Sequence, residues 1–298
     1  MKRILVTGAS GYIGAHVVRA LADRGVDVIA VDRPNGRART VDPRATAVEA
    51  DIFADPAALM EDVGPVDVCL HLAWEAGFVH NSPTHMLRLS DHVRFLEAVV
   101  AAGTPQLAAL GSMHEVGYHH GVIDENTPTE PRSLYGIAKN ALRQALEVRF
   151  GSTELTLQWL RCFYIYGDDA RNSSIFTKIS QAAVAGATSF PFTSGLNKYD
   201  FIDVHELANQ IAATVMQSTI TGVINCCSGE PVSLAERVEA FIAERGYQIE
   251  LEYGAFPDRA YDSPAVWGDP SKIRAILELT ADRPTDAHEG SFRTTSTP

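Results

Sequence analysis

The sequence predicts an α/β protein built on a parallel β-sheet with helices on both faces. Short apolar runs of β-strand character alternate with helical patterns through the first half of the chain. A glycine-rich turn joins the first such run to the first helical pattern. A length of 298 residues, with 46% hydrophobic and 21% charged residues, suffices for one large domain or two smaller ones with their own cores.

The order of elements is that of a doubly wound sheet. The first half alternates predicted strands at 3–8, 27–32, 45–51, 67–73, 106–112 and 155–163 with predicted helices at 12–24, 57–63, 86–102 and 133–150. Beyond residue 164 the pattern loosens into helices at 174–185, 207–216 and 234–245, with strand-like runs at 199–204 and 222–227. We therefore predict a first domain over 1–165, to which later segments return, and a smaller region over 166–289. Residues 290–298 lack apolar periodicity and are expected to form a flexible tail.

The charge balance and the cysteines narrow the class of protein. A formal net charge of −12 and an isoelectric point near 5.3 leave no basic stripe for nucleic-acid phosphates. The four cysteines lie in apolar runs without C-x-x-C spacing, which favours buried free thiols over a disulfide or a zinc site. The opening runs straight into a strand rather than a signal peptide, and no apolar run is long enough to span a bilayer. We therefore expect a cytoplasmic protein.

The segment TGASGYIG places Gly8, Gly11 and Gly14 between a predicted strand and a predicted helix. Glycine permits a tight turn there and lets backbone amides approach a pyrophosphate at the helix N-terminus. The second strand ends in Asp32, at the distance expected for a carboxylate that binds the adenosine ribose of a dinucleotide. The alternative is a glycine turn that merely packs strand on helix. Asp32 favours NAD, because its charge would repel the 2′-phosphate of NADP, but Arg33 follows it and leaves NADP open.

Two further strand ends lie where a dinucleotide would bind. The third strand is followed by Asp51 and Ile52, and the fourth ends in Leu72 and Ala73, a small residue whose backbone could approach the cofactor. Each is equally consistent with an ordinary strand terminus.

Tyr135 and Lys139 stand at i and i+4 of the predicted helix SLYGIAKNALRQALE, so both project from one face. A lysine ammonium and an oxidised nicotinamide nearby would each favour the phenolate and lower the tyrosine pKa toward a range where it exchanges a proton with a carbinol. Taken alone, such a pair is usually a solvated helix face. Together with the glycine turn it predicts an acid/base pair.

These segments resemble the extended short-chain dehydrogenase/reductase family, which contains nucleotide-sugar epimerases, dehydratases and 4-keto reductases. The resemblance extends over nearly the whole chain and includes HLA, RCFYIYG, YDFIDVHELA and DPSKIRAIL. It implies a Rossmann-type doubly wound sheet that binds the dinucleotide over 1–165, and a C-terminal substrate-binding region over 166–289. It also places Tyr12 and Ile13 at the cofactor and gives Tyr135 and Lys139 cofactor contacts beside their catalytic roles.

The same family ends its fifth strand in a Ser or Thr that hydrogen-bonds the reacting oxygen. Counting forward from LG in LGSMHEVG puts Ser112 there, whereas counting back from Val116 puts Met113, whose thioether cannot donate a hydrogen bond. We therefore predict Ser112 as catalytic and Met113 as substrate-binding. The Asp/Glu pair of the 4,6-dehydratases reads His114 and Glu115 here, which makes them possible catalytic residues of an alternative dehydratase. His114 could instead cap a loop, and Glu115 could be a surface carboxylate.

The resemblance adds three substrate-side residues. Tyr164 stands where asparagine is usual, Asn172 opens a helix that would face a diphosphate, and Arg259 resembles the arginine that pairs with it. Asn172 could equally be a plain N-cap. The arginine position of a further family triplet reads Tyr199.

From these features we expect an NAD(P)-dependent oxidoreductase of a nucleotide-activated sugar, a 4-keto reductase or epimerase that transfers hydride at C4 with Tyr135 as acid/base. The alternatives are the 4,6-dehydratase and, from another class, a non-catalytic dinucleotide-sensing module. His119 and His120 lack an acidic partner cluster, so no metal site is predicted. The expected partner is a small molecule, without nucleic acid or membrane. The resemblance implies a homodimer formed through the predicted helices 86–102 and 133–150.

Overall fold

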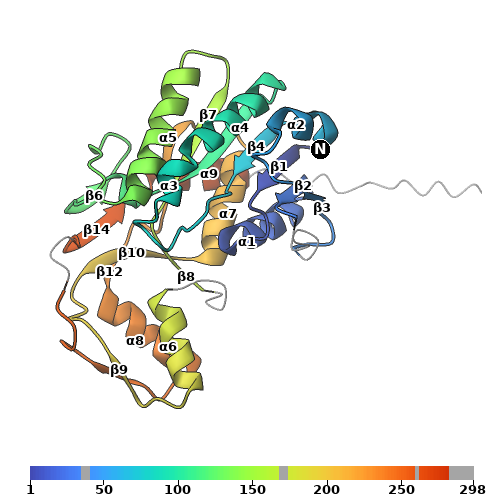
Figure 1. Ribbon diagram of the computed structural model, residues 1–298. Coiled ribbons are helices and arrows are strands. Elements are labelled where there is room, and N and C mark those ends of the chain that lie inside the picture. Colours follow the sequence, from blue (N-terminus) through green and yellow to red (C-terminus); the bar gives the residue numbers. More distant parts are fainter. Residues whose placement is uncertain (35–40, 168–173, 259–261, 282–298) are drawn as a thin grey trace, which may run out of the picture.

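The computed structural model describes residues 1–34, 41–167, 174–258 and 262–281, and a seven-stranded parallel sheet lies at its centre (Figure 1). The chain crosses the sheet in opposite directions on the two sides of the β1–β4 boundary, where open α/β sheets bind ligands at the strand carboxyl ends. The predicted doubly wound parallel sheet is thereby confirmed. Its strand order is β3 (Thr46–Glu49), β2 (Asp27–Asp32), β1 (Arg3–Thr7), β4 (Val68–His71), β5 (Gln106–Ser112), β7 (Thr156–Cys162) and β11 (Gly222–Cys226).

Helices cover both faces of this sheet because successive strand residues point to opposite sides. In β1, Ile4 and Val6 join the core on one face while Leu5 joins the core on the other, and all three are fully buried. The first face is covered by α1 (Tyr12–Ala22), α7 (Val204–Val215) and α9 (Ser271–Ala281). The second is covered by α2 (Pro56–Val63), α4 (Leu89–Ala101) and α5 (Leu134–Phe150), with the short α3 (Thr84–Leu87) beside them.

The second half of the chain also builds a smaller lobe, which Figure 1 shows below the large sheet. The helices α6 (Ile175–Val184) and α8 (Leu234–Arg245) and the pair β13 (Glu250–Glu252) with β9 (Ser189–Pro191) belong to this lobe. A second sheet, which includes β6 (Gly121–Ile123) from the first half of the chain, has the order β12 (Pro231–Ser233), β10 (Lys198–Asp203), β14 (Ala265–Gly268) and β6, and β8 (Tyr164–Tyr166) pairs with β10. The separate apolar core of the lobe contains Phe176, Phe192 and Phe241.

Several sequence expectations can be compared with these bounds. The predicted helix 86–102 is divided into α3 and α4 around Arg88. The predicted helix 207–216 begins earlier, at Val204, because the Asp203 side chain accepts the N–H of His205 and caps it. All four cysteines are buried and unpaired, as predicted. The predicted tail 290–298 lies outside the described residues, and the domain boundary near residue 165 stays a prediction. Over the described ranges, no helix has both the length and the hydropathy that crossing a membrane requires.

Candidate active site

The glycine turn between β1 and α1 has no room for a side chain at Gly8 or Gly14. Gly8 has a φ of +68°, and a Cβ added to it would lie 2.8 Å from the Cα of Ala73. A Cβ on Gly14 would lie 2.1 Å from the carbonyl oxygen of Gly8. Gly11 is the N-cap of α1 and supplies no side-chain hydrogen bond to the first turn. The first turn of α1 therefore lacks a side-chain cap, which leaves its amides able to meet a pyrophosphate.

Asp32 closes the same turn from the end of β2. One oxygen of its carboxylate accepts hydrogen bonds from the backbone N–H of Ser10, at 2.8 Å, and from the Ser10 hydroxyl. The other accepts the N–H of Arg33 at 2.8 Å. The guanidinium of Arg33 is turned to Glu75, at 2.5 Å, so part of its charge is neutralised away from Asp32. This arrangement suits a ribose with free hydroxyls better than one carrying a 2′-phosphate.

The remaining predicted cofactor residues lie around this turn in different roles. The N–H of Leu72 and the N–H of Ala73 donate to the backbone oxygen and the side-chain oxygen of Thr7, at 3.2 and 3.3 Å. The backbone that follows β4 is therefore fixed beside Gly8. Farther out, the Asp51 carboxylate accepts the N–H of Phe53, and Ile52 is buried. Ile13 packs against the core, and the Tyr12 hydroxyl donates to the carbonyl of Gly167 at 2.6 Å.

Ser112, Tyr135 and Lys139 are brought together by two elements. Ser112 ends β5, and α5 begins after Ser133, whose hydroxyl accepts the N–H of Gly136 and caps the helix. A Cβ on Gly136 would lie 2.3 Å from the carbonyl oxygen of His114, so glycine lets α5 approach the turn after β5. Ser112 consequently lies close enough to Tyr135 to lower the pKa of the phenol. The predicted catalytic residues therefore share one site.

Burial dominates the ionisation of this site. It raises the pKa of the Tyr135 phenol above its usual value of 10, and the nearby Ser112 side chain offsets part of that rise. In the protein alone, desolvation outweighs the favourable interactions of the phenolate. The expectation that Lys139 and a bound nicotinamide together lower this pKa stays a prediction. Burial also lowers the pKa of Lys139 to about 7, against which Glu115 acts. The Lys139 ammonium donates to the carbonyl of Leu110 at 2.7 Å.

Glu115 is fully buried at the end of β5. Its side chain has no exposed surface, so the interpretation as a surface carboxylate is wrong. One carboxylate oxygen accepts the N–H of Ser112 at 2.6 Å, both accept the indole N–H of Trp159 at 2.9 and 3.0 Å, and Arg161 and Arg143 lie at 3.7 and 3.8 Å. Burial raises the pKa of Glu115, while the neighbouring charges and hydrogen bonds lower it. The carboxylate thus holds the end of β5 from behind, and a role in proton transfer to substrate is not favoured.

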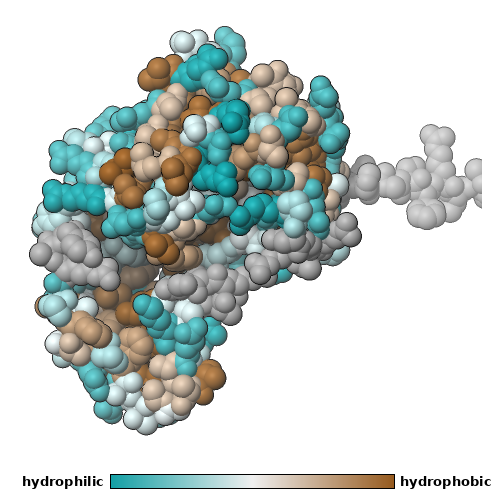
Figure 2. Space-filling view, in the orientation of Figure 1, coloured by the Kyte–Doolittle hydropathy of each residue, from teal (hydrophilic) through white to brown (hydrophobic). Residues whose placement is uncertain are grey.

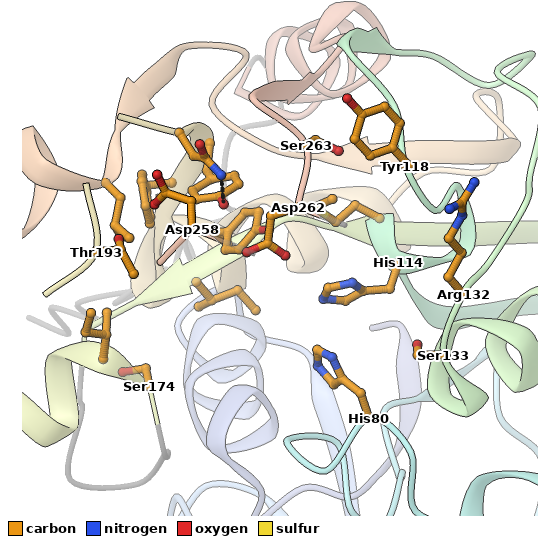
Figure 3. Close-up of a pocket in the computed structure, with 18 of the residues that line it drawn as sticks. His80, His114, Tyr118, Arg132, Ser133, Ser174, Thr193, Asp258, Asp262 and Ser263 are labelled. Atoms are coloured by element: carbon orange, nitrogen blue, oxygen red, sulfur yellow. Dashed lines mark hydrogen bonds between the residues drawn. The ribbon is translucent and has the colours of Figure 1, made fainter. Parts of the chain in front are cut away.

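A cavity of about 740 Å³ lies between the large sheet and the smaller lobe, where Figure 2 shows the surface hollowed. Met113, His114 and Tyr164 line it, as do His80 and Arg132, which the sequence analysis did not single out. Figure 3 shows His80 and His114 side by side, with Asp262 beyond them and Ser174 and Thr193 at the far end. Asn172 and Arg259 lie outside the described residues.

His80 and His114, which line the cavity, both lie against Tyr135. The His80 ring stacks on the Tyr135 ring at 5.5 Å between centroids, and its carbonyl accepts the N–H of Tyr135 at 2.8 Å. The His114 ring lies 4.4 Å from His80 and 6.0 Å from Tyr135. Burial, and to a lesser extent the charge of His80, lowers the pKa of His114 to about 4, so His114 is neutral near pH 7. Two imidazoles of the cavity lining therefore lie next to the phenol.

Comparison with known proteins identifies the family to which the chain belongs. Residues 4–227 match the family model described as the NAD dependent epimerase/dehydratase family. The chain belongs to that family. A 4-dehydrogenase of Aggregatibacter actinomycetemcomitans, "dTDP-6-deoxy-L-talose 4-dehydrogenase (NAD(+))", is 45% identical over 89% of this chain and 98% of its own length. Members of the NAD dependent epimerase/dehydratase family are enzymes, so the predicted enzyme class is confirmed.

More distant members share the fold. A UDP-glucose 4-epimerase of Lactobacillus helveticus is 26% identical over 92% of this chain and 91% of its own. The structure of a UDP-glucose 4-epimerase of Thermus thermophilus in complex with NAD superposes with a TM-score of 0.78 at 22% identity, covering 92% of each chain.

Over the described residues, no group of three or more His, Cys, Asp or Glu side chains is placed to hold a metal ion.

Proposed function

We propose that this protein is an NAD-dependent 4-dehydrogenase of a nucleotide-activated 6-deoxy sugar, which interconverts the C4 alcohol and the C4 ketone. The observation that carries the proposal is that Ser112, Tyr135 and the buried Lys139 lie together beside the glycine turn and the cavity. The 45% identical relative named for this reaction supports the choice of substrate class.

In the oxidation, Tyr135 as phenolate takes the proton of the C4 hydroxyl while the C4 hydrogen leaves as hydride, and a ketone remains. When bound, the nicotinamide supplies the hydride acceptor, and its positive charge favours the phenolate against the burial that raises the pKa of Tyr135. Ser112 holds the reacting oxygen and Lys139 favours the phenolate through its ammonium. The reduction runs through the same residues in reverse.

The residues that surround the glycine turn would hold the dinucleotide. Gly8, Gly11 and Gly14 would let the α1 amides meet the pyrophosphate, and Asp32 would accept the adenosine ribose hydroxyls. Ala73, fixed through Thr7, would lie along the dinucleotide.

The rivals of this proposal are a 4,6-dehydratase and an epimerase. A 4,6-dehydratase would need Glu115 in contact with substrate, but its carboxylate is fully buried behind Ser112. An epimerase would keep its NAD through each turnover, so stoichiometric NAD in the purified protein would favour that activity over a dehydrogenase.

We also propose that the protein is cytoplasmic and forms a homodimer through α4 and α5. Its dinucleotide-binding part would extend over 1–165 and its substrate-binding part over 166–289.

The proposal is tested by supplying NADH and a dTDP-4-keto-6-deoxy sugar and measuring oxidation of the cofactor. Tyr135→Phe removes the hydroxyl that exchanges the proton and is expected to abolish turnover while dinucleotide binding persists. Tyr253→Phe, which removes an exposed hydroxyl bonded to Glu239, is the matched control and should leave the rate unchanged. Turnover that survives in the Tyr135→Phe variant would contradict the assignment.

A further inference from the structure

Lys139 lies against an aromatic ring in the segment that follows β4. Its Nζ is 3.7 Å from the centroid of the Trp74 ring, close enough for a cation–π interaction, and donates to the Leu110 carbonyl at 2.7 Å. An ammonium has three N–H donors. The ring and the carbonyl each fix the direction of one N–H group on Nζ, which limits the direction of the third N–H.

Two buried histidines hold the indole in this orientation. The Trp74 ring stacks on His92 at 4.4 Å between centroids with an interplanar angle of 17°. Its N–H donates to Nδ1 of His85 at 3.0 Å, and Nε2 of His85 lies 3.0 Å from the carbonyl of Val79. The indole therefore has a packed face, a satisfied N–H and one face against Lys139.

The support extends from Trp74 to the glycine turn. Nδ1 of His92 lies 2.8 Å from Nε2 of His71, and Nδ1 of His71 lies 2.8 Å from the hydroxyl of Thr7, the last residue of β1. Burial, assisted by the charge of Lys139, lowers the pKa of His92 to about 3 and also lowers the pKa of His71. Both rings are consequently neutral near pH 7, so they hold the indole without repelling the ammonium.

We propose that Trp74 is a positioning residue for Lys139: its indole face keeps the buried amine charged and directed beside Tyr135, and the chain Thr7–His71–His92 fixes that face to the cofactor turn. The inference deepens the proposed function and rests on it, since it concerns the same acid/base pair. Trp74 acts through Lys139 and exchanges no proton with the substrate.

The physical effect is a preference for the ammonium over the amine. Burial opposes that charge and lowers the pKa of Lys139 to about 7, whereas the electron-rich face of an indole favours it. Other titratable groups also face the amine, and they stay unchanged when only Trp74 is replaced. They are Tyr135 on α5, Glu115 after β5, Cys162 on β7, His71 on β4 and His92 on α4.

The first test compares Trp74→Leu and Trp74→Phe with the natural protein in kcat/KM for the sugar against pH, at saturating dinucleotide. Loss of the ring lowers the charged fraction of Lys139 about three- to thirty-fold above its pKa, which moves the alkaline limb about one pH unit lower. Trp74→Phe keeps an aromatic ring, so its alkaline limb should lie close to that of the natural protein. Trp267→Phe in β14 is the matched control and should leave the profile unchanged. An alkaline limb that stays in place in Trp74→Leu would overturn the proposal.

A second test uses the protein without substrate and so separates this proposal from the proposed function. The difference in tryptophan emission between the natural protein and Trp74→Phe should change in one step as Lys139 titrates. In a Lys139→Met background the step should vanish. A flat difference spectrum, or a step that persists without Lys139, would refute the contact whether or not the protein turns over a sugar, and this result does not depend on Trp74→Leu folding.

Discussion

Replacing Lys139 with methionine should stabilise the fold while it removes turnover. Lys139 is 3% exposed, and burial lowers its pKa from 10.5 to about 7. At 1.36 kcal/mol per pKa unit, keeping this amine charged costs the folded protein about 5 kcal/mol. Losing the hydrogen bond to Leu110 and the contact with Trp74 offsets about 2–3 kcal/mol. The expected net gain for Lys139→Met is about 2 kcal/mol in the free energy of unfolding below pH 7.

The gain depends on pH in a fixed direction. Between about pH 7 and pH 10.5 the unfolded chain binds the lysine proton more tightly than the folded chain does, so the natural protein becomes more stable as pH rises through this window. Below pH 7 both states are protonated and the full cost applies. The advantage of the methionine variant is therefore largest in mild acid and shrinks toward alkaline pH.

The assay is urea unfolding of both proteins at about pH 6 and about pH 9, with equal slopes taken as evidence of equal surface exposure. Lys178→Met, on the exposed side of α6, is the matched control and should gain nothing. A methionine variant that is less stable at both pH values, or a gain that does not shrink with pH, would refute the burial cost assigned to Lys139.

The other predictions concern the carboxylates and the glycine turn. Glu115→Gln should lower the free energy of unfolding by about 3 kcal/mol, because the buried Arg161 loses its counter-charge, and an unchanged urea midpoint would contradict this. Gly14→Ala should abolish NADH binding, since its Cβ would meet the Gly8 carbonyl at 2.1 Å; a fluorescence titration with the natural affinity would rule the clash out. Asp32→Asn should weaken NAD binding about tenfold and narrow the preference over NADP, so calorimetric dissociation constants in an unchanged ratio would remove Asp32 from the ribose site.

Local sequence patterns were sufficient for the sheet and for the acid/base pair. Alternating apolar runs predict strands buried on both faces, and Leu5 and Val6 show why, since each serves a different core. Gly8 and Gly14 are identifiable because a turn of this shape excludes a side chain. Tyr135 and Lys139 are predictable because helical periodicity alone puts them on one face.

The supporting residues escape such patterns because their partners are distant in sequence. Trp74 contacts Lys139, 65 positions along the chain, only because the end of β4 and the first turns of α5 meet behind the strand ends. Glu115 reads as a loop carboxylate until β7 brings Trp159 and Arg161 onto it. His80 lies in a segment without periodicity and is placed by its backbone contact with Tyr135. No spacing rule anticipates contacts that tertiary packing creates.

Hydride tracing tests the central claim most directly. The protein would be given NADH carrying deuterium at nicotinamide C4, on each face in turn, together with a dTDP-4-keto-6-deoxy sugar, and the product would be analysed by mass spectrometry and NMR. We predict deuterium at C4 of the sugar from one of the two labelled faces and from neither in Tyr135→Phe. Sugar product without deuterium, or deuterium at another carbon, would contradict the proposed reaction.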